Sequence, residues 1–137
     1  MRLFPTILVL CVTGLALGGC AESSENSTGS SAAAACRVKY STNDWDVGFT
    51  ATVKITNRGT QPIAGWELAF DFPTGQKVTE VWSSKVASRG EHVTLRAEAW
   101  NGDIPAGQSV EIGFNGSHTG KNTPPREFTL NGVRCAS

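Results

Sequence analysis

Between residues 48 and 115, hydrophobic and polar side chains alternate with a period of two rather than the 3.6 of a helix. In the stretch GFTATVKITN, every second residue from Phe49 to Ile55 is hydrophobic and the residues between them are polar. Three more stretches follow the same pattern: GWELAFDFP (65–73), HVTLRAEAW (92–100) and SVEIGFN (109–115). One hydrophobic and one polar face is typical of an antiparallel strand that buries one of its sides.

Segments rich in turn-forming residues separate these stretches, namely NRGTQPIAG, PTGQ, SRGE and NGDIPAG. We expect further strands near 37–42, 76–83 and 126–134, and no helix. Short strands at this spacing predict an all-β domain, built as an antiparallel β-sandwich of immunoglobulin-like or jelly-roll-like type.

The first 19 residues contain one arginine, a hydrophobic run and then small residues, as in a secretory signal peptide. The run is short and broken by glycine, which disfavours the alternative of a retained membrane helix. The LGGC motif that ends at Cys20 resembles the lipobox of bacterial lipoproteins, in which this cysteine carries lipid. We therefore expect export, a lipid anchor on Cys20 and a flexible serine-rich tether over 20–35. Secretion after cleavage at another site is the alternative.

The cysteines divide into two groups. Cys11 lies in the predicted signal peptide and Cys20 in the lipobox, which leaves Cys36 and Cys135 as an even pair in an exported chain. These two residues bracket the predicted domain, 36–137. A disulfide between them would close a loop of about 100 residues and stabilise the domain by a few kcal/mol.

The charge balance and the distribution of catalytic residue types exclude several function classes. The chain has 12 basic and 12 acidic residues, a balance that does not favour nucleic acid or an anionic surface as a partner. His92, His118 and the two remaining thiols match no metal-ligand spacing, so we expect neither a metal nor a cofactor. The carboxylates are scattered rather than paired across a cleft, so we expect no glycosidase site. A copper monooxygenase would need a histidine at the mature N-terminus, where we expect a cysteine.

Strand parity separates the four tryptophans. Trp66 alternates with the hydrophobic residues of its stretch and is predicted to lie in the core, whereas Trp100 falls on a polar face and is predicted to be exposed. Trp82 is predicted to point outward, but less clearly, because it shares a strand face with the charged Glu80 and the hydrophobic Val78. Trp45 lies among turn-forming residues, and extending the strand over 48–57 backwards would point it inward. Tryptophan is seldom fully buried, so a half-buried packing role is the alternative for each.

Exposed indoles provide flat apolar surfaces, and a sugar ring has a matching apolar face of C–H groups. Burying half of one indole against such a ring is worth roughly 2–3 kcal/mol before costs. Side-chain amides near the tryptophans are candidates for hydrogen bonds to hydroxyls: Asn43, Gln76, Asn101 and Asn115. Stacking on nucleobases would need a basic groove, which the composition does not indicate.

The motifs NDWDVGFTATV, GWEL, VWSS, AWNGDIPAG and GFNGSHTG occur in this order between Cys36 and Cys135. Together they resemble a family 2 carbohydrate-binding module, the bacterial cellulose-binding domain, over essentially all of 36–135. The resemblance implies a β-sandwich whose two ends are joined by a disulfide. It also implies binding of cellulose without catalysis.

By motif, Trp45, Trp82 and Trp100 match the three surface tryptophans of the cellulose-binding type, and Trp66 matches the buried one. A tryptophan in NDW as well as in VWSS and AWNG favours this type over the two-tryptophan xylan type. The resemblance places polar ligand contacts at four residues: Asn43, Glu80, Asn101 and Asn115. Glu80 is a departure from the family, because a neutral amide is common at its position.

We therefore predict a monomeric, non-catalytic module that binds cellulose or a related insoluble β-glucan and is held on the membrane through a lipid anchor. One alternative is an appendage of a glycoside hydrolase system that binds xylan or chitin. The other is an immunoglobulin-like module whose tryptophans contact a protein partner, since tryptophan is enriched at interface hot spots.

Overall fold

Eleven strands form the part of the chain that the structure, a computed structural model, describes, residues 34–137. No helix occurs among these residues, and therefore none there is long enough to span a bilayer. The predicted signal peptide, Cys20 and nearly all of the predicted tether lie outside the described residues. The all-β prediction is confirmed for the domain.

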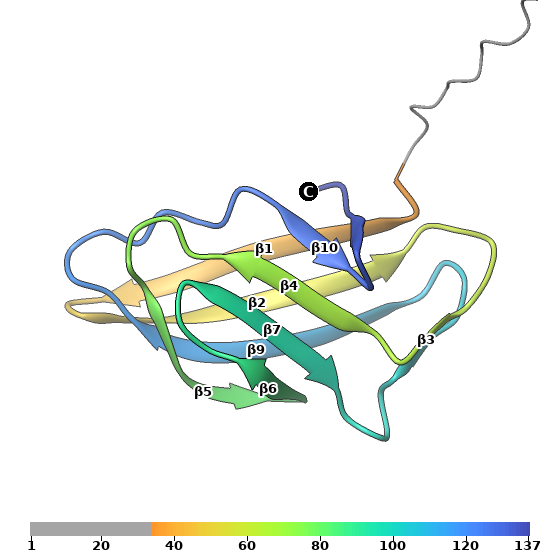
Figure 1. Cartoon of the computed structure of the whole chain (residues 1–137), viewed down its shortest axis with the longest axis horizontal. Coiled ribbons are helices and arrows are strands. Elements are labelled where there is room, and N and C mark those ends of the chain that lie inside the picture. The colour runs from red at the N-terminus through yellow and green to blue at the C-terminus, as the bar shows by residue number, and fades with distance from the viewer. Residues whose placement is uncertain (1–33) are drawn as a thin grey trace, which may run out of the picture. The chain divides into compact units, whose positions relative to one another are not determined.

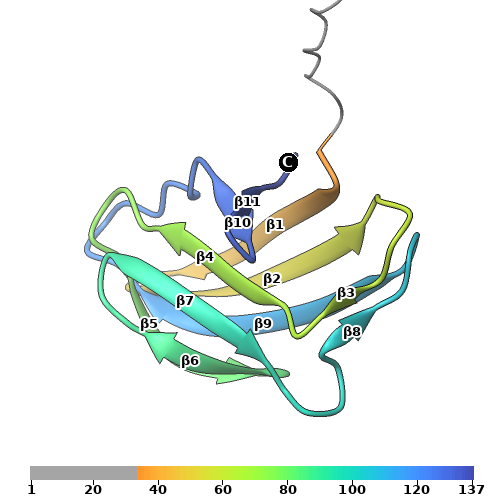
Figure 2. The same ribbon diagram turned by 45° about the vertical axis from the view of Figure 1, so that its right-hand side comes forward.

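Two antiparallel sheets account for nine of the strands. The first has the order β1 (Cys36–Trp45), β2 (Gly48–Asn57), β9 (Ser109–Ser117) and β5 (Lys77–Trp82). The second has the order β11 (Val133–Arg134), β10 (Phe128–Leu130), β4 (Glu67–Asp71), β7 (His92–Ala97) and β6 (Ser84–Ser88). A small ribbon pairs β3 (Ile63–Ala64) with β8 (Asp103–Ile104). Figures 1 and 2 show the second sheet stacked on the first, as in a β-sandwich.

The core lies between the sheets and is built from the residues that alternate inward. Phe49, Ala51, Val53 and Ile55 of β2 are fully buried, as the alternation predicts. Phe70 of β4, from the opposite sheet, stacks on Phe114 of β9 with ring centroids 5.9 Å apart. Each buried side chain of this size contributes roughly 1.5–3 kcal/mol, so the hydrophobic face determines which side of each strand is left for solvent.

Some strand boundaries differ from the prediction. β1 extends to Trp45 instead of ending near residue 42, and 126–134 forms two short strands, β10 and β11, around a turn at Asn131 and Gly132. β7 ends at Ala97, so Trp100 belongs to the following turn rather than to the strand tip. Strand β6 was not predicted, because its residues lack a clear alternation.

The ends of the domain are joined covalently and by hydrogen bonds. Cys36 and Cys135 form a disulfide across 99 residues of sequence, with 4.8 Å between their Cα atoms. Beside it, the Val38 amide donates to the Ala136 carbonyl at 2.8 Å, and the Ala136 amide donates to the Cys36 carbonyl at 2.9 Å. The predicted disulfide is therefore confirmed, and it closes the fold at the edge strand β1.

We expect the double substitution Cys36→Ser and Cys135→Ser to lower the free energy of unfolding by about 2–4 kcal/mol, because the unfolded chain gains freedom when a long loop is opened. Urea unfolding of the variant and of the oxidised protein measures the difference. The reduced wild-type protein should match the variant. Equal midpoints for the oxidised and reduced proteins would contradict the stabilising role of the bridge.

Candidate functional site

Three of the four tryptophans lie at the surface and one lies in the core. The exposed fractions are 50% for Trp45, 41% for Trp82 and 73% for Trp100, against 1% for Trp66. Trp45 and Trp82 belong to the two edge strands of the first sheet, and Trp100 lies in the turn after β7. We call the outward surface of the first sheet between Trp45 and Trp82, together with Trp100, the tryptophan face.

Trp45 is the last residue of β1, and it points outward because it lies on the polar side of that strand. Along this strand Cys36 and Val38 are buried, and the residues at odd positions, Trp45 among them, lie on the opposite side. The turn at 46–47 then starts β2 with the hydrophobic face restored at Phe49. Extending β2 backwards therefore gives the wrong side for Trp45, because the hairpin turn lies between them.

Trp82 points outward because of a β-bulge in β5. Val78 is buried opposite Gly116 of β9, while Trp82 is paired with Gly113 and exposed. The register shifts by one residue between Val78 and Glu80. An extra residue in one strand reverses the sides that follow it, which explains why simple parity left Trp82 ambiguous.

Each of these two indoles lies across a glycine of the neighbouring strand. Trp45 is paired with Gly48, and a Cβ atom added to Gly48 would lie 2.7 Å from the indole Nε1. Trp82 is paired with Gly113, where an added Cβ would lie 2.4 Å from Cε2 and from Cζ2. The missing side chains let both rings lie against the sheet, with one side packed on the backbone and the other open to solvent.

The turn that carries Trp100 is held by Asn101 and by the buried Trp66. The Trp66 indole nitrogen donates to the Asn101 carbonyl at 2.8 Å. The Asn101 side chain accepts from the Glu98 amide at 2.8 Å and donates to the Ser83 carbonyl at 2.8 Å. Asn101 is a predicted ligand contact, and the structure shows that its amide holds the turn in place.

The bond to Ser83 connects Trp100 to Trp82. Ser83 directly follows Trp82 and has a φ of 62°, in the left-handed region, where the chain passes from β5 of the first sheet to β6 of the second. Strand corners of this kind use a local backbone irregularity to change sheets. Through Asn101, this corner and the Trp100 turn form one hydrogen-bonded unit.

Between Trp45 and Trp82, polar side chains form a row across all four strands of the first sheet. Strand register places Asn43, Thr50, Asn115 and Glu80 side by side. The Thr50 hydroxyl donates to the side-chain oxygen of Asn115 at 2.8 Å, and the side-chain nitrogen of Asn115 donates to the Glu80 carboxylate at 3.1 Å. Three predicted polar residues are thus brought together, and Thr50 is a member that the sequence did not indicate.

Gln76 was also a candidate for hydrogen bonds to a ligand, and the structure contradicts this prediction. Gln76 is 1% exposed, and its side-chain oxygen Oε1 accepts from the Thr74 backbone amide at 2.9 Å. Its amide nitrogen donates to Asn122 at 3.1 Å and to the Thr123 carbonyl at 2.7 Å. All three bonds are internal, so Gln76 orders the loop after β9 rather than facing a ligand.

A hollow of about 780 Å³ lies elsewhere, along the edge of β1. Its lining includes Tyr40, Phe128 and four exposed cations, Arg37, Lys39, Lys54 and Arg58, and none of the exposed tryptophans. Burial raises the pKa of the Tyr40 hydroxyl, and the charge of Asp44 raises it further. The tryptophan face itself is an open surface, suited to a flat ligand rather than to a small enclosed one.

Comparison with known proteins finds relatives in sequence and in structure. Exoglucanase A of Cellulomonas fimi is 52% identical over 100 residues, which are 73% of this chain and 12% of that enzyme. A cellulose/chitin binding protein of Mycobacterium tuberculosis is 37% identical over 126 residues, or 91% of this chain and 82% of that protein. The solution structure of the chitin-binding domain of Chi18aC from Streptomyces coelicolor, 36% identical, matches with a TM-score of 0.60 over 75% of this chain and 98% of that domain.

The chain thus spans only 12% of the length of exoglucanase A. The family model described as cellulose binding domain matches residues 36–135, from one cysteine of the disulfide to the other. This match includes the three exposed tryptophans, the glycines beneath two of them and the polar row. The chain belongs to the cellulose-binding domain family of carbohydrate-binding modules.

Proposed function

We propose that this chain binds cellulose, or a related insoluble β-glucan, through the tryptophan face and does not cleave it. The observation that carries the proposal is the exposure of Trp45, Trp82 and Trp100, with two of the rings lying across glycines. Rings held in this way expose one apolar surface each without needing to reorganise when the ligand binds. Pre-organisation of this kind reduces the entropy lost on binding.

Stacking and hydrogen bonding have separate places on the face. An indole that covers a sugar ring with half of its surface gains roughly 2–3 kcal/mol before costs. The row formed by Asn43, Asn115 and Glu80 lies between two of the indoles and offers polar groups to hydroxyls. A polymer that spans the face would meet both kinds of contact, and contacts with an uncharged polymer depend little on salt.

Chitin is the second candidate ligand, because the Mycobacterium relative is named for cellulose and chitin. Both polymers present flat β-linked sugar rings, and the stacking surface alone does not separate them. A protein partner is less well supported, since rings lying flat over glycines favour a planar ligand. Adsorption to washed insoluble cellulose and chitin, with a non-binding protein as control, distinguishes these candidates.

A non-catalytic role is supported by the carboxylates of the face. Hydrolysis of a glycosidic bond needs two carboxylates on either side of the scissile bond. Glu80 is instead bonded to the Asn115 amide, on an open surface. We therefore infer that the chain attaches a cell, or an enzyme that it accompanies, to the polysaccharide.

For the part of the chain before the domain, we infer export and lipid attachment at Cys20. The support is the sequence alone: the hydrophobic segment, the LGGC motif and the serine-rich residues that follow. A tether of this composition would hold the domain near the membrane while leaving the tryptophan face free to meet an insoluble polymer.

Alanine substitutions separate the three exposed tryptophans from the buried one. We expect Trp45→Ala, Trp82→Ala and Trp100→Ala to weaken adsorption to cellulose by about 1–3 kcal/mol each, because one stacked ring is lost. Their melting temperatures should stay close to that of the wild type. Trp66→Ala should instead cost roughly 3–5 kcal/mol of stability. If the three exposed variants adsorb like the wild type, the tryptophan face is not the binding surface.

Substitution of the glycine beneath Trp82 tests whether the ring must lie flat. We expect Gly113→Ala to weaken adsorption by roughly 1 kcal/mol, about fivefold, because the new methyl group displaces the indole. Gly59→Ala is the matched control, since an added Cβ there would lie 3.4 Å from its nearest neighbour atom. Thermal unfolding should show both variants folded. Equal adsorption of both would contradict the role of the glycine.

We expect Cys20→Ala to move the full-length protein from the membrane fraction to the soluble or secreted fraction, because a lipobox cysteine is the attachment point for lipid. Fractionation of cells that express each protein, with immunodetection, measures the shift. Cys11→Ala, in the predicted signal peptide, is the control and should not change the fractionation of the mature protein. Wild-type behaviour of Cys20→Ala would contradict lipid attachment.

A further inference from the structure

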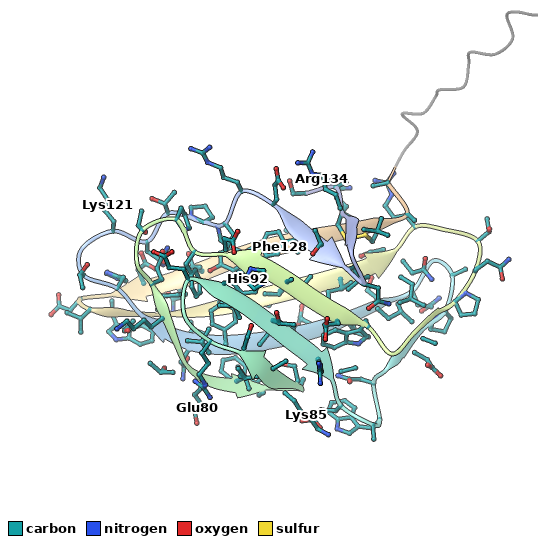
Figure 3. All side chains as sticks on the ribbon, in the orientation of Figure 1. Glu80, Lys85, His92, Lys121, Phe128 and Arg134 are labelled. Carbon is teal, nitrogen blue, oxygen red and sulfur yellow. A yellow bond between two sulfur atoms is a disulfide. The ribbon has the colours of Figure 1, made fainter. Side chains whose placement is uncertain are left out.

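Glu80 is the charged member of the polar row on the tryptophan face. Its strand register places it beside Asn115, one row from the Trp82–Gly113 pair. Figure 3 shows its side chain pointing away from the sandwich, on the side of β5. A ligand stacked on Trp82 would therefore pass close to this carboxylate.

The hydrogen bonds of the row fix which groups a ligand meets there. The Asn115 side-chain amide points its nitrogen toward Glu80, because a carboxylate can only accept, and its oxygen accepts from the Thr50 hydroxyl at 2.8 Å. That nitrogen donates to one Glu80 carboxylate oxygen at 3.1 Å. A carboxylate accepts hydrogen bonds and donates none, so its remaining lone pairs can bind only donor groups.

Glu80 takes part in no ion pair within the described domain. None of the ion pairs found among residues 34–137 includes Glu80. Two cations lie near it without forming an ion pair: Lys77, one row away opposite Ser117, and Arg89, whose guanidinium donates to the Val78 carbonyl at 3.1 Å. The carboxylate is therefore not engaged in an ion pair and can accept a hydrogen bond from a cation on a ligand.

Other charges on this sheet lie farther from Glu80. Asp46 adjoins Trp45 in an exposed turn, whereas the cations Lys39 and Lys54 pair across strands at the other end of the sheet. Lys54 is four residues along β2 from Thr50, about 13 Å at the usual rise of a strand. Such a separation exceeds the screening length at physiological salt, about 8 Å, so these cations have little effect at Glu80.

An amino sugar supplies the complementary group. In a β-linked polymer of glucosamine, a protonated amine replaces a hydroxyl or an acetamido group while the stacking surface of the ring is kept. A hydrogen bond from an ammonium to a carboxylate is roughly twice as strong as one between neutral groups. A uronic acid would instead place a second negative charge near Glu80 and would be repelled.

We propose that Glu80 gives this module a preference for β-linked polysaccharides that carry free, protonated amino groups, such as partly deacetylated chitin. The inference rests on the proposed function, because it assigns a ligand class to the same face. The site is formed by the Glu80 carboxylate, oriented by Asn115 and Thr50, beside the Trp82 ring. The ring supplies stacking to any flat polymer, and the carboxylate distinguishes among them.

Adsorption to two forms of one material tests the proposal. Insoluble, partly deacetylated chitin is compared with a portion of the same chitin after its amines have been acetylated again, in slightly acidic buffer of low salt. We expect the wild type to adsorb about two- to fivefold more tightly to the amine-bearing form, the range for an exposed ion pair. Glu80→Gln keeps the shape and the acceptor for Asn115, and it should abolish the preference. High salt should reduce the preference of the wild type as well.

Glu111→Gln is the matched control. Glu111 is exposed on β9, on the same side of the sheet, but it is paired with Lys54 rather than with a residue near the tryptophans. This variant removes the same charge and should retain the preference. Equal adsorption of the wild type to both forms of chitin, or loss of the preference in Glu111→Gln, would overturn the proposal.

Cellulose in the same experiment separates this inference from the proposed function. The wild type and Glu111→Gln should both adsorb to cellulose, since Glu111 lies away from the tryptophans, opposite Lys54. If the wild type and Glu111→Gln adsorb to cellulose but neither prefers the amine-bearing chitin, only the role of Glu80 is wrong. If the folded wild type adsorbs to none of these polymers, the proposed function and this inference both fail.

Discussion

The pleat of the first sheet is the constraint on which the tryptophan face depends. Successive residues of a strand point to opposite sides of the sheet. Because Phe49 and Ile55 are buried, the direction of every side chain between them is fixed. The hydrophobic side packs on the second sheet, and the opposite side must face solvent. Thr50, in the polar row, lies on that exposed side because its neighbours in sequence are buried.

The exposed side becomes a binding surface through the pairing of aromatic residues with glycines. Trp45 and Trp82 are on opposite edge strands, and each meets a glycine on the adjacent inner strand. An indole beside a larger residue would stand away from the sheet. Beside Gly48 or Gly113 the indole ring lies flat on the sheet and buries one of its two faces. This burial offsets part of the cost of leaving a large apolar group in water.

The third tryptophan uses a different support. Trp100 is in a turn, and the hydrogen bonds of Asn101 hold that turn against Trp66 and the Ser83 corner. The buried tryptophan therefore contributes to the position of an exposed one. This coupling explains how a loop residue can have a defined place relative to rings that are carried on strands.

Much of this arrangement could be predicted from the sequence, because alternation is a local property. The core side of β2, the burial of Trp66 and the exposure of Trp100 all follow from neighbouring residues, although Trp100 proved to lie beyond the strand end. The side of the sheet on which Trp45 lies depends on the position of the β1–β2 turn. The side on which Trp82 lies depends on the bulge in β5. Neither the turn position nor the bulge has a clear pattern in the nearby sequence. The partners Gly48 and Gly113 depend on strand register. Gln76 appeared available only because its contacts with the loop after β9 are distant in sequence.

The indole N–H signals of the four tryptophans in an NMR spectrum test the central claim most directly. On addition of a soluble cello-oligosaccharide, the signals of Trp45, Trp82 and Trp100 should shift or broaden, because those rings form the face that meets the sugar. The Trp66 signal should stay in place, since this indole is 1% exposed and donates to the Asn101 carbonyl. A response confined to Trp66, or to residues along the hollow beside β1 such as Tyr40, would contradict the account.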